Sequence, residues 1–221
     1  PFMKGVRHVM VVPDGALQSL PLGVFVTEEP QGEFTDFSGY RHTKWLAKKY
    51  AFSVLPSVRS LKALRVFAKS ATADQPFAGF GNPILDGEEG AQKGVEIASL
   101  FTKGTVANVE QLKNLPRLPD TANELRAIAL SLNAEDSSLY LGSKATESTV
   151  KHTNLSNVRV LAFSTHGLVA GQLKGISEPG LVLTPPDEAT DLDDGYLTAS
   201  EVAQLDLNAD WVILSACNTA S

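Results

Sequence analysis

The sequence VRVLAFSTHG occupies residues 158–167, and residues 210–219, DWVILSACNT, repeat its design near the end of the chain. Each segment is a run of apolar and β-branched residues with the length expected of a fully buried strand. Each run ends in one chemically capable side chain, His166 in the first and Cys217 in the second. We therefore expect two buried strands that present a histidine and a thiol at their ends, a pair that can act as base and nucleophile.

The composition is that of an ordinary soluble globular chain, with 221 residues of which 43% are hydrophobic and 20% charged. The formal net charge of −6 and the lack of a basic stripe argue against a nucleic-acid surface, because phosphate contacts need clustered cations. No apolar run approaches the roughly 20 residues that span a bilayer, and the first residues lack the order of a signal peptide. We expect a cytoplasmic protein without a membrane segment in this chain.

Cysteine and glycine patterns exclude several kinds of site. Cys217 is the single cysteine, which rules out an internal disulfide and Cys₄ or Cys₂His₂ zinc sites. A mononuclear metal site on His166 and Cys217 has no supporting ligand spacing, and we expect neither a metal nor a cofactor. Residues 79–83, GFGNP, lack the third glycine and the following helix of a dinucleotide-binding fingerprint.

Strand and helix patterns alternate along the chain. Apolar runs predict strands at residues 7–12, 51–55, 76–85, 138–141, 158–165 and 211–215, and a further apolar run lies at residues 180–183. Helical spacing and N-caps predict helices at residues 44–50, 57–69, 121–133 and 146–152, and one that begins at residue 198. Capping boxes are predicted at Thr121–Glu124 and Thr198–Glu201.

Two stretches have weaker patterns. Residues 16–26 predict a short turn followed by a strand or an irregular packing segment, and residues 86–119 predict a surface excursion with a short helix or hairpin, in which only Val95–Leu100 is periodic. The alternation elsewhere predicts an α/β fold with a mostly parallel sheet flanked by helices on both faces, because parallel strands need crossover connections.

The predicted sheet gives the two strand ends a chemical role. Ligand sites in such sheets lie beyond the carboxyl ends of the strands, where both His166 and Cys217 are expected. Histidine suits the base because its ordinary pKa is near neutral, so it can assist the thiol and later protonate the leaving amine. Gly167 permits a sharp turn, and its N–H and that of Cys217 can form an oxyanion hole. Each residue alone has an ordinary structural explanation, but together they predict a catalytic dyad.

The two motifs resemble those of a known group of enzymes. Residues 164–167, STHG, followed by residues 215–217, SAC, are similar to the histidine–glycine and alanine–cysteine blocks of caspase-like cysteine peptidases. His166 precedes Cys217 by 51 residues, and about 50 is typical of caspases. Residues 218–219, Asn-Thr, stand where caspases carry Arg-Gly or a close variant, so the chain looks like a relative and not a caspase.

A nearer resemblance is to the CHAT domain, a caspase-like module often found with tetratricopeptide repeats in bacteria. The similar segments are MVVPDGALQSLPLGVF (10–25), LPSVRSL (55–61), GFGNP (79–83), LPDTANEL (118–125) and YLGSKAT (140–146). The resemblance covers essentially the whole chain and implies a single caspase-like domain over residues 1–221. It also implies that His166 and Cys217 hydrolyse a peptide bond through a thioester intermediate.

Further implications concern partners and the extent of the chain. The resemblance implies a protein substrate and, as a partner, a tetratricopeptide-repeat or other regulatory region in the same full-length protein. We expect a fragment that is incomplete at its C-terminus, because the chain starts at Pro1 without Met and stops at Ser221, before the strands that would complete the sheet and the substrate groove. The alternative function is a catalytically silent CHAT module that acts as a regulated protein-interaction domain.

An acidic run lies between the two motifs, at Asp187, Glu188, Asp191, Asp193 and Asp194. A charge run of this kind is commonly a solvated loop. Acidic pockets select a basic residue in several relatives of this peptidase clan, which suggests that one of these side chains reaches the pocket beside Cys217. Asp193 and Asp194 are the residues we predict for this substrate-binding role.

Overall fold

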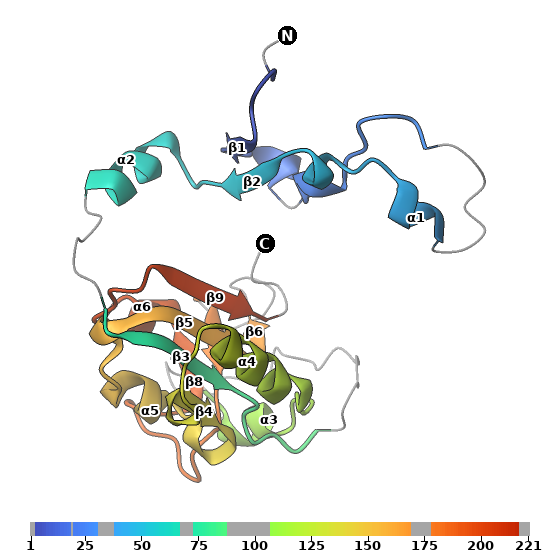
Figure 1. The fold of residues 1–221 in the computed structure, drawn as a ribbon. Helices are drawn as coiled ribbons and strands as arrows, with labels where there is room; N and C mark the ends of the chain where they lie inside the picture. Colours follow the sequence, from blue (N-terminus) through green and yellow to red (C-terminus); the bar gives the residue numbers. More distant parts are fainter. Residues whose placement is uncertain are drawn as a thin grey trace. The chain divides into compact units, whose positions relative to one another are not determined.

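A computed structural model describes residues 3–18, 20–30, 38–66, 73–87, 107–168 and 178–216. The chain divides into two compact units, which cover residues 1–69 and 70–220, and each unit is described by itself (Figure 1). The expectation of a single domain over residues 1–221 stays a prediction. No helix in the described ranges is long and apolar enough to cross a membrane.

The first unit is built on two parallel strands, β1 (His8–Val11) and β2 (Ala51–Val54), both at predicted positions. Its remaining elements are η1 (Gly15–Leu17), η2 (Leu22–Val24), α1 (Ser38–His42), η3 (Leu46–Lys48) and α2 (Val58–Val66). The hydroxyl of Ser57 accepts the backbone N–H of Ser60 at 3.1 Å, which confirms the predicted N-cap of α2. Residues 44–50 contain a 3₁₀ turn instead of the predicted helix, and the predicted end of α2 at Lys69 lies outside the described residues.

A four-stranded parallel sheet in the order β4-β3-β5-β9 is the centre of the second unit (Figure 1). Its strands are β3 (Gln75–Gly81), β4 (Leu139–Leu141), β5 (Val158–Ser164) and β9 (Trp211–Ser215). All three strand pairings are parallel. The sequence prediction of an α/β fold with a mostly parallel sheet is therefore confirmed.

Each face of this sheet has its own apolar core, because neighbouring residues of a strand point to opposite sides. Helix α4 (Asp120–Ser131) covers one face, where Leu125 and Ala129 pack with Phe77 and Ala162. Helix α5 (Glu147–His152) covers the other face. Its Val150 is buried there in a second cluster, which includes Ala78, Phe80, Leu161 and Phe163. Burial on both faces explains why β3 and β5 are continuous apolar runs. The expectation of a second buried strand at residues 211–215 is wrong: β9 is at the edge of the described sheet, and Trp211, Val212 and Leu214 are 69%, 50% and 46% exposed.

Short elements connect these layers. They are α3 (Val109–Lys113), η5 (Asp136–Ser138), η6 (Gly142–Lys144) and η7 (Leu155–Asn157). Helix α3 is a short helix within the predicted excursion at residues 86–119, whereas the periodic stretch Val95–Leu100 lies outside the described residues.

A small antiparallel sheet follows the end of β5. It contains β6 (Gly167–Leu168), β7 (Gly180–Val182) and β8 (Tyr196–Thr198), and only β7 falls in a predicted apolar run. Helix α6 (Ala199–Val202) starts directly after β8, and the predicted capping box between Thr198 and Glu201 is confirmed. Strands of two or three residues are too short to give a recognisable alternation, so β6 and β8 were not predicted.

The predicted capping box at the start of α4 is wrong. The helix begins at Asp120, and no side-chain bond caps it. Thr121 Oγ1 instead accepts the backbone N–H of Asn82 at 2.9 Å, and the carboxylate of Glu124 accepts a hydrogen bond from Ser164 Oγ. Both side chains bind neighbouring segments at the carboxyl end of the sheet, so tertiary contacts replace the local cap.

We predict that Leu125→Ala lowers the free energy of unfolding by about 3 kcal/mol, because a fully buried leucine is replaced by a cavity. Leu125 fills the space that glycine leaves in β3, since a Cβ on Gly81 would lie 2.7 Å from Leu125 Cδ1. Leu130→Ala is the matched control on the same helix: Leu130 is 80% exposed, so its loss should stay within about 0.5 kcal/mol. Denaturant unfolding measures both, and equal losses would contradict the placement of α4.

Candidate active site

Strands β5 and β9 are neighbours whose carboxyl ends lie at the same level. The register pairs Ser164 with Ser215, and the N–H of Thr165 donates to the carbonyl of Ser215 at 3.2 Å. Neighbouring strands lie about 4.8 Å apart. His166 follows Thr165 directly, whereas Cys217, two residues after Ser215, lies outside the described residues. The structure thus brings the two predicted strands side by side with matching ends.

The imidazole of His166 is half-buried and is held by the segment that follows α3. Its Nε2 lies 2.8 Å from the carbonyl oxygen of Pro116. A carbonyl can only accept, so Nε2 carries the proton, and Nδ1 is the basic nitrogen of the neutral ring. The backbone of His166 is fixed as well, because its carbonyl accepts the N–H of Val182 at 2.9 Å.

The position of Pro116 follows from an isolated parallel bridge with Gly87. Gly87 donates to the carbonyl of Leu115 at 3.1 Å and accepts from the N–H of Arg117 at 3.3 Å. Pro116 lies between Leu115 and Arg117, so its carbonyl points away from Gly87 and toward His166. Proline fits there because the bridge does not use its missing N–H. Sequence reasoning missed Pro116, since a backbone contact across 50 residues leaves no motif.

The residues on either side of His166 both contact β7 of the small antiparallel sheet. Thr165 is buried, and its hydroxyl donates to the carbonyl of Val182. Gly167 is buried in β6 and pairs with Leu181 in β7. The expected oxyanion hole from Gly167 and Cys217 stays a prediction.

The two acidic residues predicted to bind substrate are used within the domain. Asp194 is 9% exposed, and its two oxygens accept the backbone N–H groups of Tyr196, at 2.9 Å, and of Ala107. Burial raises the pKa of Asp194. Asp193 accepts the N–H of Ser148 at 3.3 Å through Oδ2, while its Oδ1 is buried without a hydrogen-bond partner. The substrate-binding role of both residues stays a prediction.

A buried carboxylate that sequence reasoning missed supports the acidic loop. Glu147 is only 1% exposed, and its Oε2 accepts the N–H groups of Asp194 at 2.9 Å and Gly195 at 3.2 Å. Lys151 Nζ donates to Oε1 of Glu147 and, at 2.8 Å, to Glu201. Burial raises the pKa of Glu147 to about 7, against the lowering effect of Lys151. In the sequence, Glu147 is indistinguishable from any acidic residue in the first turn of a helix.

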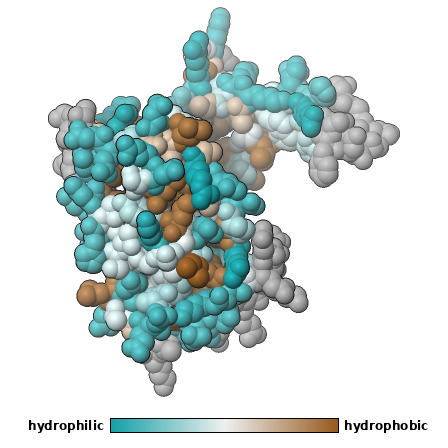
Figure 2. Space-filling view, turned by 60° about the horizontal axis from the view of Figure 1, so that its bottom comes forward, coloured by the Kyte–Doolittle hydropathy of each residue, from teal (hydrophilic) through white to brown (hydrophobic). Residues whose placement is uncertain are grey.

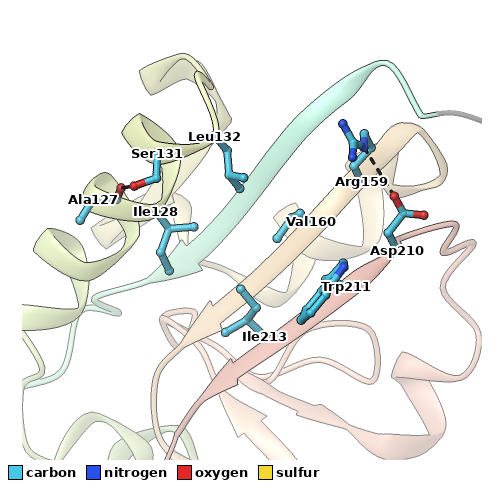
Figure 3. A pocket seen from close by; sticks show the side chains of 9 residues that line it. All are labelled: Ala127, Ile128, Ser131, Leu132, Arg159, Val160, Asp210, Trp211 and Ile213. Carbon is cyan, nitrogen blue, oxygen red and sulfur yellow. Dashed lines mark hydrogen bonds and ion pairs between the residues drawn. The ribbon is translucent and has the colours of Figure 1, made fainter. Parts of the chain in front are cut away.

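An apolar hollow of about 490 Å³ lies at the other end of the sheet. Ile128 and Leu132 of α4 face Val160, Trp211 and Ile213 of the strands across it (Figure 3). Its rim holds the ion pair between Arg159 and Asp210, whose Nε and Oδ2 are 3.5 Å apart, near the amino ends of β5 and β9. The hollow is therefore separate from His166, which follows the carboxyl end of β5.

Apolar side chains are also exposed on the surface of the described residues. Several apolar residues gather along the middle of the face drawn in Figure 2, among hydrophilic ones. Among the described residues, no group of three His, Cys, Asp or Glu side chains is arranged to hold a metal ion.

The second unit is an α/β domain with a mostly parallel sheet, helices on both faces and a histidine two residues after the end of β5, an arrangement consistent with the caspase-like fold. The family model for the CHAT domain matches residues 2–221, so the chain belongs to this caspase-like, peptidase-related family. The resemblance found in the sequence is thereby confirmed. Comparisons with curated proteins and with solved structures found no match.

The buried Glu147 makes stability depend on pH in a defined direction. Its pKa is about 7 in the folded chain, against an ordinary 4.5, so between these values the folded state holds a proton that the unfolded state has lost. The contribution of Glu147 to the free energy of unfolding is therefore greatest at low pH and falls as pH rises from about 4.5 to about 7.

We predict that Glu147→Gln removes this dependence. The stability of the parent minus that of the variant should fall between about pH 5 and pH 8 and be level above about pH 8, as measured by urea unfolding at each pH. Glu135→Gln, at an exposed position, is the control and should give a level difference. A difference for Glu147→Gln that rises with pH would mean that the carboxylate is ionised by Lys151 despite its burial.

Proposed function

We propose that this CHAT domain is the catalytic part of a cysteine endopeptidase, with Cys217 as nucleophile and His166 as base and acid. The observation that supports the proposal is the register of β5 and β9. It aligns Ser164 with Ser215, the last residues of the two strands, and each predicted catalytic residue follows two positions later in the sequence. A continued register would put the imidazole and the thiol next to each other.

The side-chain directions agree with this pairing. Ser164 faces α4, where its hydroxyl reaches Glu124, and Thr165 faces the other side, toward Val182. If this alternation continued past the end of β5, His166 would return to the α4 side. Its ring is held by the carbonyl of Pro116. Ala216 packs against the core on the opposite face, so the same alternation would turn Cys217 toward the α4 side.

The proposed reaction begins with proton transfer from the thiol of Cys217 to Nδ1 of His166. The thiolate then attacks the carbonyl carbon of the scissile peptide, and the N–H groups of Gly167 and Cys217 would stabilise the oxyanion. The imidazolium gives its proton to the leaving amine as the C–N bond breaks and the thioester forms. Water, deprotonated at His166, then attacks the thioester, which releases the acid and returns the proton to sulfur.

The carbonyl of Pro116 has a defined part in this sequence. It accepts a hydrogen bond from Nε2–H of His166 at every step. The ring therefore keeps the tautomer whose Nδ1 can receive the thiol proton. When Nδ1 is protonated, the same carbonyl stabilises the imidazolium, because hydrogen bonds to charged donors are stronger than neutral ones.

The proposed substrate is a protein, and the proposed partner is a tetratricopeptide-repeat or other regulatory region in the same full-length protein. Selection of a basic residue before the scissile bond is part of the proposal. Of the two predicted acidic residues, Asp193 is the better candidate, because its buried Oδ1 has no hydrogen-bond partner, whereas both oxygens of Asp194 already accept backbone N–H groups. Contact with a substrate would require this oxygen to become accessible.

Reporter peptides that differ only in the residue before the scissile bond test the specificity. Arg and Lys reporters should be cleaved faster than an Asp reporter, because an acidic pocket attracts a cation and repels a carboxylate. The measurement is kcat/KM for the three peptides with the full-length protein. A preference for Asp, or no preference among the three, would remove the acidic pocket from the proposal.

We predict that Cys217→Ala and His166→Ala each lower peptide cleavage by at least about 1,000-fold in the full-length protein. His152→Ala, an exposed histidine on α5, is the control and should retain parental activity. Labelling with an iodoacetamide probe, mapped to Cys217 by mass spectrometry, should be slower in His166→Ala. If Cys217→Ala processes substrate as well as the parent, the domain is a silent interaction module and the peptidase proposal is wrong.

A further inference from the structure

We infer that Asp194 is a positioning residue for His166, an inference that rests on the proposed function. The carboxylate of Asp194 is buried, and its two oxygens hold two separate segments of the chain through the N–H groups of Ala107 and Tyr196. Each of these segments makes a contact with His166 or with a residue two positions after it. Asp194 is thus the common anchor of the structure around the imidazole.

The first connection runs from Ala107 to the ring of His166. Asp194 Oδ2 accepts the N–H of Ala107, at the start of the segment that carries α3 and Pro116. Asn108 caps α3 by accepting the N–H of Gln111 at 3.2 Å. One apolar cluster holds the segment in place and consists of Leu85, Ala107, Leu112, Leu115, Val182 and Tyr196. A shift of Ala107 would therefore move the carbonyl that orients the imidazole.

The second connection runs through Tyr196 to the backbone around His166. Asp194 Oδ1 accepts the N–H of Tyr196 at 2.9 Å, and Tyr196 pairs with Val182, whose own N–H donates to the carbonyl of His166. The buried hydroxyl of Tyr196 also lies 3.2 Å from the carbonyl of Glu178 and 3.5 Å from that of Leu168. Both the backbone and the side chain of Tyr196 thus restrain the strands on either side of His166.

The backbone of Asp194 is itself held in position by a second carboxylate, that of Glu147. Oε2 of Glu147 accepts the N–H groups of Asp194 and Gly195. Gly195 has a φ of +83°, and a Cβ there would lie 2.7 Å from Pro185 Cα, so the turn requires glycine. The backbone of Asp194 is consequently held by contacts that do not involve its own side chain, which bonds to the other two segments.

A carboxylate is required at this position because both bonding partners are N–H donors. Asparagine has one oxygen to accept one of them, and its amide NH₂ would face the other donor. Asp194→Asn therefore keeps the size of the side chain and loses one of the two connections. The aspartate acts on the reaction only through the orientation of His166, since its own oxygens are already bonded.

The test measures how the rate of Cys217 alkylation by iodoacetamide depends on pH. In the parent, the dyad should make Cys217 react faster near neutral pH than in His166→Ala, because a properly oriented imidazole promotes the thiolate. Asp194→Asn should lie between the two, at least about threefold slower than the parent at pH 7. Asp206→Asn, which removes an exposed aspartate, is the control and should follow the parent.

Three comparisons in this experiment decide the outcome, each made on full-length protein at a temperature where unfolding curves show all variants to be folded. Identical pH profiles for the parent and His166→Ala would overturn the proposed dyad, whatever Asp194 does. Distinct profiles for those two, with Asp194→Asn equal to the parent, would overturn only the positioning role. If Asp194→Asn does not fold, Asp194→Ser replaces it, because a serine hydroxyl cannot accept both N–H groups and brings no amide NH₂ toward either donor: a slower rate near pH 7 supports the inference, and a parental profile overturns it.

Discussion

Parallel pairing on both edges of β5 is the constraint on which the rest of the second unit depends. β3 and β9 satisfy the backbone groups of β5, and α4 and α5 bury its two faces. A strand held in this way has no freedom to shift its register, because a slip of one residue would exchange its two faces. Only Thr165 lies between the end of this strand and His166, so the position of β5 determines the position of the His166 backbone.

Beyond the ends of the parallel strands, side-chain carboxylates replace the regular ladder. Buried backbone N–H groups need acceptors, and the loop between β7 and β8 has no strand to supply them. Glu147 accepts two N–H groups of this loop, those of Asp194 and Gly195. Asp194 in turn accepts the N–H groups of Tyr196 in β8 and of Ala107 before α3. The desolvation that raises the pKa of both carboxyl groups is the cost of this arrangement.

Sequence reasoning succeeds where burial alone decides the structure and fails where a side chain has two sets of available partners. The apolar run at residues 158–165 is buried against both faces of the unit, so its strand was predicted. The run at residues 211–215 also forms the predicted strand, but at the edge of the described sheet its side chains are largely exposed. Thr121–Glu124 and Thr198–Glu201 carry the same local signal, yet only the second pair forms a capping box. The first pair lies against Asn82 and Ser164, and no pattern in the sequence indicates those contacts.

The contact between His166 and Pro116 shows why part of the site is invisible in the sequence. A carboxylate that oriented the ring would be a recognisable third residue, whereas a carbonyl can come from any residue whose backbone is turned correctly. Here the bridge to Gly87 turns it, and a Cβ on Gly87 would come within 2.5 Å of the carbonyls of Asn114 and Leu115. A glycine outside both motifs thus permits the close approach that directs Pro116 toward His166. The group that orients the imidazole is a backbone carbonyl, which every residue has. The orientation of His166 therefore depends on the packing that holds the backbone of Pro116 in place.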